Sequence, residues 1–369
     1  MLDFHRADLA RLAARDRLRM LAPQRGRDFA SNDYLGLANS PRLAAAIAQG
    51  VAEGVPVGSG GSRLLRGNHP EHEALEAEAA AFFGAEASLY FSSGYTANVA
   101  IMATLPQRGD LIVHDALVHA SMHEGMTLSR ATAVAAAHND AGAFEDAIRT
   151  WRGQGGKGTP WIAVESLYSM DGDTAPLAEL YAVAERHDAM LIVDEAHATG
   201  VFGTRGQGLA TPGERVVSLH TCGKALGCEG AQVAGPAIVR DYLVNRGRGF
   251  IFSTAPSPLM ARAVREGLRI LADEPERRAS LHQRIALAGE RLGPHGALAQ
   301  GTPIMPLILR DNGRTMRAAE ALQERGFDIR GIRPPTVPVG AARLRLSITL
   351  NVEAADILAL DQALSEVLA

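Results

Sequence analysis

The sequence predicts an α/β protein with a mainly parallel central sheet covered by helices on both faces, followed by a smaller C-terminal α+β unit. Short apolar runs alternate with stretches of helical composition through the first two thirds of the chain, which is typical of parallel strands buried on both faces. After "GFIFSTAPSP" (249–258) the chain changes to long Arg/Ala/Leu helices with two further apolar runs. At 369 residues and 47% hydrophobic composition, it is long enough for more than one domain.

The expected elements follow in order along the chain. Residues 2–20 place leucines near helical spacing, so we expect an amphipathic N-terminal arm. "NHPEHEALEAEAAAFFG" (68–84) has a proline in its first turn and a glycine at its end, so we expect a helix there. The apolar runs expected to be strands are "SLYF", "LIVH", "TAVAAA", "WIAVES", "MLIVDE" and "VVSLH". The predicted division is an N-terminal arm over 1–35, a large α/β domain over 36–272 and an α+β domain over 273–369.

Composition and charge exclude several classes of function. The formal net charge is -4 and no run of Lys or Arg exceeds two residues, so we expect no nucleic-acid partner. Only Cys222 and Cys228 occur, without a second Cys/His pair at zinc spacing, so we expect neither a disulfide framework nor a metal site. No apolar stretch of about 18 residues appears, so we expect no membrane span and a cytoplasmic location.

The segment "VDEAHATG" (193–200) contains the letters of a helicase acidic box. A helicase also needs a phosphate loop of the form GxxxxGK[ST], and the chain has none, so we reject that interpretation. Asp194 directly follows an apolar strand, and ligands of open parallel sheets bind outside the carboxyl ends of the strands. We therefore expect Asp194 to be functional. The alternative is that it caps a turn or pairs with an arginine.

Lys224 lies in "HTCGKALG" (220–227) and is one of very few lysines in a chain whose cations are nearly all arginine. Lysine can lose its proton when desolvated and form an imine, which arginine cannot do. Pyridoxal 5'-phosphate needs such a lysine and a carboxylate that keeps its pyridine nitrogen protonated, and Asp194 can be this carboxylate. The alternative is a solvated lysine in a surface turn.

A phosphate site should accompany this pair. "YFSSGYTANVA" (90–100) reads as strand, Ser-Gly turn and helix, which directs backbone amides toward an anion at the helix N-terminus. An ordinary βα turn has the same letters. "GSGGSRLLRGN" (58–68) is glycine-rich but lacks the dinucleotide pattern, so we expect a mobile loop on the substrate side.

Taken together, these stretches resemble the α-oxoamine synthases. The motifs that carry the resemblance are "SNDYLGL" (31–37), "GSGGSRLLRGN", "SSGYTAN" (92–98), "HASMHEG" (119–125), "SMDGD" (169–173), "VDEAHATG", "TCGKALG" and "RPPTVPVGAARLRLSIT" (333–349). The resemblance implies a dimeric fold-type I pyridoxal phosphate enzyme that condenses an amino acid with an acyl thioester and releases carbon dioxide.

Within the family, the last motif resembles most the biotin-pathway branch. This branch joins L-alanine to a pimeloyl thioester carried by coenzyme A or by acyl carrier protein. A sister synthase that uses glycine or serine with another acyl thioester stays open, because the cofactor chemistry is shared and only the pockets differ. A non-catalytic partner subunit on the same scaffold is a remote alternative, since such a subunit would be expected to lack Lys224.

The resemblance also implies roles for individual residues. Lys224 would form the imine, Asp194 would pair with the pyridine nitrogen, and His197 would bond the ring oxygen. His119 would stack over the ring, although a histidine at a helix start is otherwise more often a satisfied core imidazole. Further cofactor contacts are implied for Gly94, Tyr95, Thr221, Glu165 and Ser169, and for Ser253 and Thr254 across a homodimer with shared active sites.

The implied substrate contacts involve arginines. Asn32 and Arg345 would bind the amino-acid carboxylate, and an arginine fork suits this role because it can form two parallel hydrogen bonds. Arg333, Ser62 and Arg63 are the candidates for the acyl substrate. For Arg333 the alternative is an ordinary solvated strand arginine.

Overall fold

The computed structural model describes residues 2–368 and divides the chain into two compact units. The large unit comprises Leu35–Tyr168 and Thr174–Pro275; the small unit comprises Met1–Tyr34, Ser169–Asp173 and Glu276–Ala369. The N-terminal residues belong to the small unit, where β1 (Arg27–Asp28) pairs in parallel with β10 (Phe327–Asp328). The division at 35 and 272 stays a prediction.

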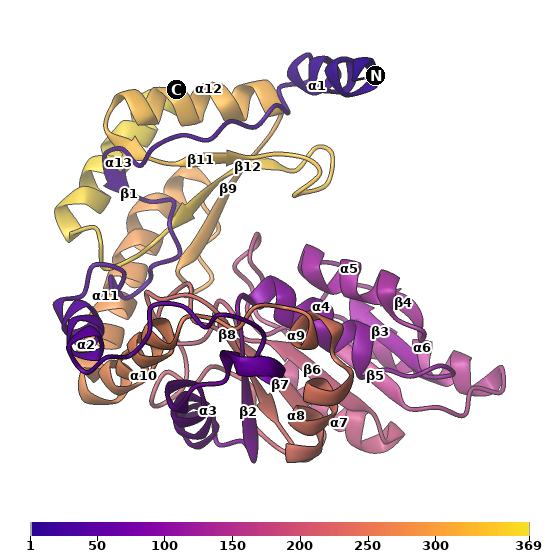
Figure 1. The fold of residues 1–369 in the computed structure, drawn as a ribbon. Helices are drawn as coiled ribbons and strands as arrows, with labels where there is room; N and C mark the ends of the chain where they lie inside the picture. Colours follow the sequence, from indigo (N-terminus) through magenta and orange to yellow (C-terminus); the bar gives the residue numbers. More distant parts are fainter. Residues whose placement is uncertain (1, 369) are drawn as a thin grey trace. The chain divides into compact units, whose positions relative to one another are not determined.

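The large unit contains a seven-stranded sheet with the order β2-β8-β7-β6-β5-β3-β4 (Figure 1). The strands are β2 (Ala87–Phe91), β3 (Leu111–Asp115), β4 (Thr132–Ala136), β5 (Pro160–Glu165), β6 (Met190–Asp194), β7 (Val216–Thr221) and β8 (Ala231–Gly235). All pairings are parallel except the two made by β8. The predicted mainly parallel sheet is therefore confirmed, and the six expected strands are present.

Helices cover both faces of this sheet. One core packs side chains such as Ile101, Met122 and Phe250 against Val217 and Leu219 of β7. The other core, on the opposite face, gathers side chains of α6 and α7. The helices of the large unit are α2 (Pro41–Ala52), α3 (Pro70–Phe83), α4 (Gly94–Thr104), α5 (Ala120–Leu128), α6 (Ala141–Gly153), α7 (Leu177–His187), α8 (Ala237–Arg246), α9 (Arg248–Ile251) and α10 (Pro258–Asp273), with a π-helical turn η1 (Arg63–Gly67).

Helix α3 shows why the sequence signals at its ends were informative. The His69 ring accepts a hydrogen bond from the backbone N–H of Glu71, and Pro70 occupies the first helical position, where its missing N–H costs nothing. Gly84 ends the helix in the left-handed region at φ 71°, a conformation that glycine adopts without strain. The predicted helix over 68–84 is confirmed.

The small unit contains a three-stranded antiparallel sheet with the order β11-β12-β9. Its strands are β9 (Ile304–Arg310), β11 (Arg330–Ile332) and β12 (Ala342–Ser347). Its helices are α1 (Asp3–Ala13), α11 (Pro275–Leu292), α12 (Asn312–Glu324) and α13 (Ala354–Leu368), with a 3-10 turn η2 (Gly293–His295). Because α12 contacts β9, β11 and β12, the predicted α+β character of the C-terminal part is observed.

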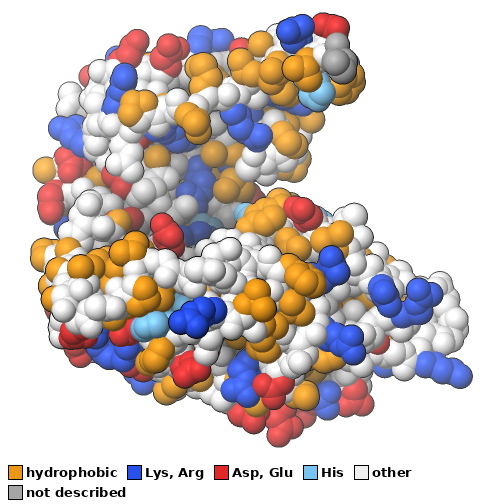
Figure 2. All heavy atoms as spheres, in the orientation of Figure 1, with side chains coloured by type: hydrophobic (Ala, Val, Ile, Leu, Met, Phe, Trp, Pro, Cys, Tyr) orange, Lys and Arg blue, Asp and Glu red, His pale blue; other side chains and the backbone are white. Residues whose placement is uncertain are grey.

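The N-terminal arm forms α1, which buries none of its side chains. Phe4 and Leu9 are 71% and 53% exposed, and Figure 2 shows apolar and charged side chains together over this helix. The following residues are attached to the small unit, since the Leu18 carbonyl accepts a hydrogen bond from Arg333 Nη2 at 3.1 Å. Within residues 2–368, no helix combines the length and apolar character needed to cross a membrane.

Candidate functional site

The polar residues predicted to be functional stand at the carboxyl ends of neighbouring strands in the large unit. Glu165 ends β5, Asp194 ends β6 and Thr221 ends β7, and all three side chains are buried. The strand register places Glu165 directly beside Asp194. Since parallel strands present their carboxyl ends at one edge of the sheet, these side chains share the edge where ligands of such folds bind.

Asp194 is held from two sides. Its Oδ2 accepts a hydrogen bond of 2.7 Å from Asn98 Nδ2, and its Oδ1 accepts one of 2.9 Å from the backbone N–H of Ala196. Asp194 thus does cap the turn that follows it, as the alternative interpretation expects. Among residues 2–368, however, no arginine forms an ion pair with it, so this buried carboxylate has lone pairs left for a ligand donor.

Lys224 lies in the bend that follows β7 and is half-buried. Its Nζ is 2.7 Å from Nε2 of His197, which follows the neighbouring strand β6. An ammonium group has only donors, so His197 Nε2 accepts this hydrogen bond when Lys224 is charged. The contact joins two predicted catalytic residues and argues against a solvated surface lysine.

His119 caps the N-terminus of α5. Its Nδ1 accepts a hydrogen bond from the backbone N–H of Ser121 at 3.3 Å and lies 2.8 Å from Ser121 Oγ. The neutral ring therefore carries its proton on Nε2. The pKa of His119 is below its usual value, mainly because of desolvation. The negative charge of Asp194 raises this pKa, and the positive charge of Lys224 lowers it. The rings of His119 and Tyr95 are nearly perpendicular, with an interplanar angle of 82° and centroids 6.2 Å apart.

The predicted phosphate residues meet at the N-terminus of α4. Ser93 caps this helix by accepting the N–H of Thr96 at 3.1 Å. A Cβ built on Gly94 would lie 3.5 Å from Thr221 Oγ1, so the first residue of the helix faces the end of β7. Helix N-termini favour anions because unpaired N–H groups and the helix dipole point outward there. Tyr95 is exposed, and its hydroxyl donates to Glu124 instead.

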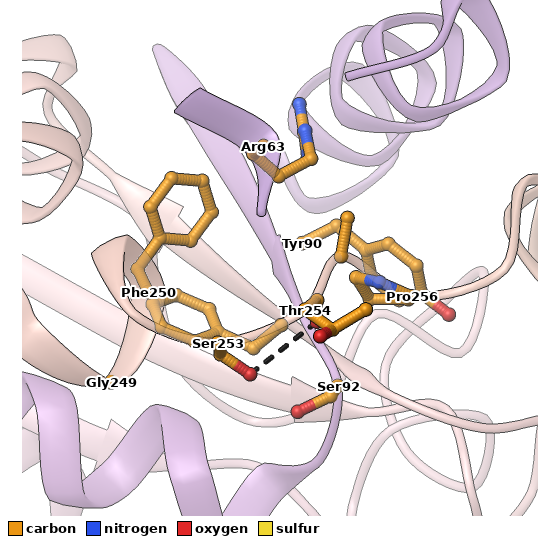
Figure 3. A pocket seen from close by; sticks show the side chains of 10 residues that line it. Arg63, Tyr90, Ser92, Gly249, Phe250, Ser253, Thr254 and Pro256 are labelled. Carbon is orange, nitrogen blue, oxygen red and sulfur yellow. Dashed lines mark hydrogen bonds between the residues drawn. The ribbon is translucent and has the colours of Figure 1, made fainter. Parts of the chain in front are cut away.

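Ser253 and Thr254 follow α9 and line a small pocket together with Arg63, Tyr90 and Phe250 (Figure 3). The guanidinium of Arg63 is already bound by Glu76 through two hydrogen bonds of 2.8 and 3.0 Å, so a ligand would have to compete with this carboxylate.

The glycine-rich loop that precedes this pocket in the chain contains a helical turn. Ser62 begins the turn η1, and its carbonyl accepts the N–H of Gly67 at 2.9 Å. A Cβ on Gly67 would lie 2.2 Å from the Gly61 carbonyl oxygen, so the loop folds tightly on itself. The tight contact at Gly67 is one that only glycine permits. The mobility expected for the loop over 58–68 stays a prediction.

In the small unit, Arg345 of β12 is only 6% exposed, and four polar groups surround its guanidinium. Three of them are the Ser169 carbonyl at 2.6 Å from Nε, Ser347 Oγ at 2.7 Å from Nη1 and Asn32 Oδ1 at 2.9 Å from Nη2. The fourth is the hydroxyl of Tyr34. All four partners are uncharged, so the positive charge of Arg345 and one of its five N–H groups remain for a ligand, which suits a carboxylate.

Arg333 differs from Arg345, because protein groups already engage it. One of its Nη atoms contacts Met316 Sδ and the other donates to the Leu18 carbonyl. Desolvation, followed by the positive charge of Arg19, lowers the pKa of Arg333. These contacts are structural.

Asn98 and Ser121, which the sequence reasoning did not single out, contact the predicted site residues. Asn98, 2% exposed, donates both to Asp194 and to Ser121 Oγ, the latter at 3.0 Å. It therefore links the carboxylate at the end of β6 to the serine that orients His119. The available signal was a polar residue at a buried position of the apolar helix "GYTANVAIMAT".

This chain is similar to proteins of known family. The family model described as aminotransferase class I and II matches residues 26–360. The chain belongs to this family. Among its relatives, the 8-amino-7-oxononanoate synthase of Chromobacterium violaceum is 45% identical over 88% of this chain and 85% of its own length. That of Burkholderia thailandensis is 44% identical over 91% and 87%, respectively.

Two solved structures agree with the fold. Serine palmitoyltransferase from S. paucimobilis, in a variant with bound PLP–myriocin aldimine, superimposes with a TM-score of 0.90 at 25% identity, covering 99% of this chain and 97% of that one. The 8-amino-7-oxononanoate synthase of Francisella tularensis gives 0.77 at 28% identity, covering 92% and 97%. The fold-type I architecture implied by the sequence resemblance is thus confirmed.

Proposed function

We propose that this protein is a pyridoxal phosphate-dependent acyltransferase that joins L-alanine to a pimeloyl thioester. The products are 8-amino-7-oxononanoate, carbon dioxide and the free thiol, so the protein would serve biotin biosynthesis. The observation that carries the proposal is the juxtaposition of Lys224 with His197, beside a buried Asp194 on the adjoining strand end. The relatives named 8-amino-7-oxononanoate synthase support the choice among acyltransferases.

The residues present fit the cofactor. Lys224 supplies an amine, Asp194 supplies a buried carboxylate, and the α4 N-terminus with Gly94 and Thr221 supplies an anion site. Pyridoxal phosphate, when bound, supplies an aldehyde that forms an imine with an amine and a ring that withdraws electrons from the substrate carbon. Asp194 would hold the protonated ring nitrogen, and His197 would hold the ring oxygen. Glu165, Ser169 and Tyr95 are proposed as further cofactor contacts.

The chain's own groups can manage the proton transfers. When the Lys224 amine is not bound to the cofactor, it would be the base that accepts the Cα proton of alanine and later returns it. His119 keeps its Nε2 proton available as a donor, because Nδ1 is occupied by Ser121. Asn98 and Ala196 hold the Asp194 carboxylate in place, so its charge needs no reorganisation during the reaction.

Arg345 and Asn32 are proposed to bind the alanine carboxylate, with the uncompensated charge of Arg345 as the main attraction. For the acyl substrate, carried by coenzyme A or by acyl carrier protein, Ser62 is retained as a candidate. Arg63 and Arg333 are retained as well, but each would first have to leave its protein partners. We also propose a homodimer in which Ser253 and Thr254 bind the cofactor of the partner subunit. The protein would act in the cytoplasm.

The decisive experiment is a product assay. The holoenzyme is incubated with L-alanine and pimeloyl-CoA, and 8-amino-7-oxononanoate is measured by mass spectrometry, with glycine and L-serine as alternative amino acids. We expect product from alanine and none from Lys224→Ala. Turnover of glycine or serine in preference to alanine would assign the chain to a sister synthase. Turnover by Lys224→Ala would refute the imine assignment.

A further inference from the structure

The segment Ser169–Asp173 has an unusual place in the fold. It follows β5 of the large unit after a short connection, residues 166–168, yet it belongs to the small unit. Four successive carbonyls of this segment each accept a hydrogen bond from a side chain of that unit. The pairs are Ser169 with Arg345 Nε (2.6 Å), Met170 with Arg343 Nη1 (3.1 Å), Asp171 with Gln300 Nε2 (3.2 Å) and Gly172 with Thr302 Oγ1 (2.8 Å).

Gly172 leaves this segment little freedom to shift. It adopts φ 74°, and a Cβ at this position would lie 2.2 Å from the Ile304 carbonyl oxygen. The backbone therefore lies directly against the first residue of β9, and only glycine fits there. Thr302, which is 2% exposed, holds the Gly172 carbonyl from the residues that lead into the same strand.

Two arginines of β12 contact this segment, but a carboxylate neutralises the charge of only one of them. Arg343 and Arg345 are two positions apart, so they lie on one face of the strand, and they are 3% and 6% exposed. Arg343 forms an ion pair of 2.5 Å with Asp171 Oδ1, which neutralises it. Arg345 contacts only uncharged acceptors. A buried cation without a counter-ion is unfavourable, so Arg345 is the one suited to receive an anion.

We propose that Ser169–Asp173 is a positioning element for Arg345. The row of bound carbonyls fixes the Ser169 carbonyl, which in turn orients the guanidinium so that its remaining N–H group and its charge stay available to the substrate carboxylate. Thr302, Gln300 and Arg343 act through this segment and do not touch the substrate. The inference rests on the proposed function, because it assigns the carboxylate of the amino-acid substrate to Arg345.

The test compares Thr302→Val with Thr302→Ser in the holoenzyme. Valine has the shape of threonine but cannot donate to the Gly172 carbonyl, whereas serine keeps the hydroxyl. Dissociation constants are measured from the change in visible absorption with L-alanine and with L-alaninol, which has the amine but no carboxylate. Hydrogen exchange over residues 169–173, followed by mass spectrometry, reports the segment independently of ligand binding.

We expect Thr302→Val to weaken L-alanine binding about fivefold, the factor that one hydrogen bond typically contributes. Binding of L-alaninol should stay unchanged, exchange over 169–173 should become faster, and Thr302→Ser should behave as the wild type. Equal weakening of both ligands, or unchanged alanine binding despite faster exchange, would overturn the inference. A wild-type protein that responds to neither ligand would instead refute the proposed function.

Discussion

The histidine of β7 offers a quantitative prediction about stability. His220 is 2% exposed and stacks on Phe83, with ring centroids 3.6 Å apart. Its Nδ1 lies 2.9 Å from Thr199 Oγ1, and its Nε2 lies 2.8 Å from Ser218 Oγ. Thr199 donates to the Glu195 carbonyl, so its oxygen accepts the His220 Nδ1–H. Both ring nitrogens are therefore satisfied in the neutral form, and burial lowers the pKa of His220 to about 3.

The sign and size of the effect follow from proton linkage. Between pH 6.5 and 3 the unfolded chain binds a proton at this histidine and the folded chain does not, so stability is lost as the pH falls through this range. Taking an unfolded pKa of 6.5, the loss between pH 7.5 and pH 5 is about 2 kcal/mol. His72, whose pKa is lowered to about 4 mainly by burial, should add a similar amount.

The assay is urea denaturation at pH 7.5 and pH 5 for the wild type and for His220→Asn. The variant is expected to be less stable at pH 7.5, because it loses the stacking on Phe83, but to lose about 2 kcal/mol less than the wild type on acidification. His5→Asn, on the exposed helix α1, is the matched control and should follow the wild type. An unchanged pH dependence in His220→Asn would refute the claim that His220 stays neutral in the folded protein.

Three further predictions concern the site. Asp194→Asn keeps the shape of the side chain but removes its charge, so kcat should fall about 100-fold or more; a variant with wild-type kcat would remove the role of this carboxylate. Arg345→Lys replaces a fork by a point charge, so KM for L-alanine should rise about tenfold, and an unchanged KM would exclude Arg345 as the carboxylate receptor. Gly94→Ala places a methyl 3.5 Å from Thr221 Oγ1, an ordinary contact. Its melting temperature as apoprotein should therefore match the wild type while its cofactor affinity, measured by equilibrium dialysis, falls; unaltered affinity would argue against phosphate binding there.

The sequence was most informative where signals are local. Continuous apolar runs predicted six strands of the large sheet, and the polar residue at the end of a run, such as Asp194, marked the edge proposed as the site. Strand β8 was not predicted, because "AQVAG" is built mostly of small residues and lacks the aliphatic run of its neighbours. The two-residue pair β1 and β10 is too short to leave a periodic pattern.

Long-range pairing was the part that the sequence did not reveal. Arg63 looked available for a substrate until the structure placed Glu76 against it, and a residue pair of this kind has no signature in composition or spacing. The inclusion of Ser169–Asp173 in the small unit depends on side chains more than 120 positions later, such as Thr302. Both features arise from tertiary contacts, which override local preferences.

The visible absorption spectrum of the purified protein with pyridoxal phosphate, before and after addition of L-alanine, reports whether Lys224 forms an imine with the cofactor. We expect a yellow protein whose band shifts with alanine and much less with glycine or L-serine, and we expect Lys224→Ala to lack the starting band. A wild-type protein that gains no band with pyridoxal phosphate, or a Lys224→Ala variant with the same band, would refute the proposed function.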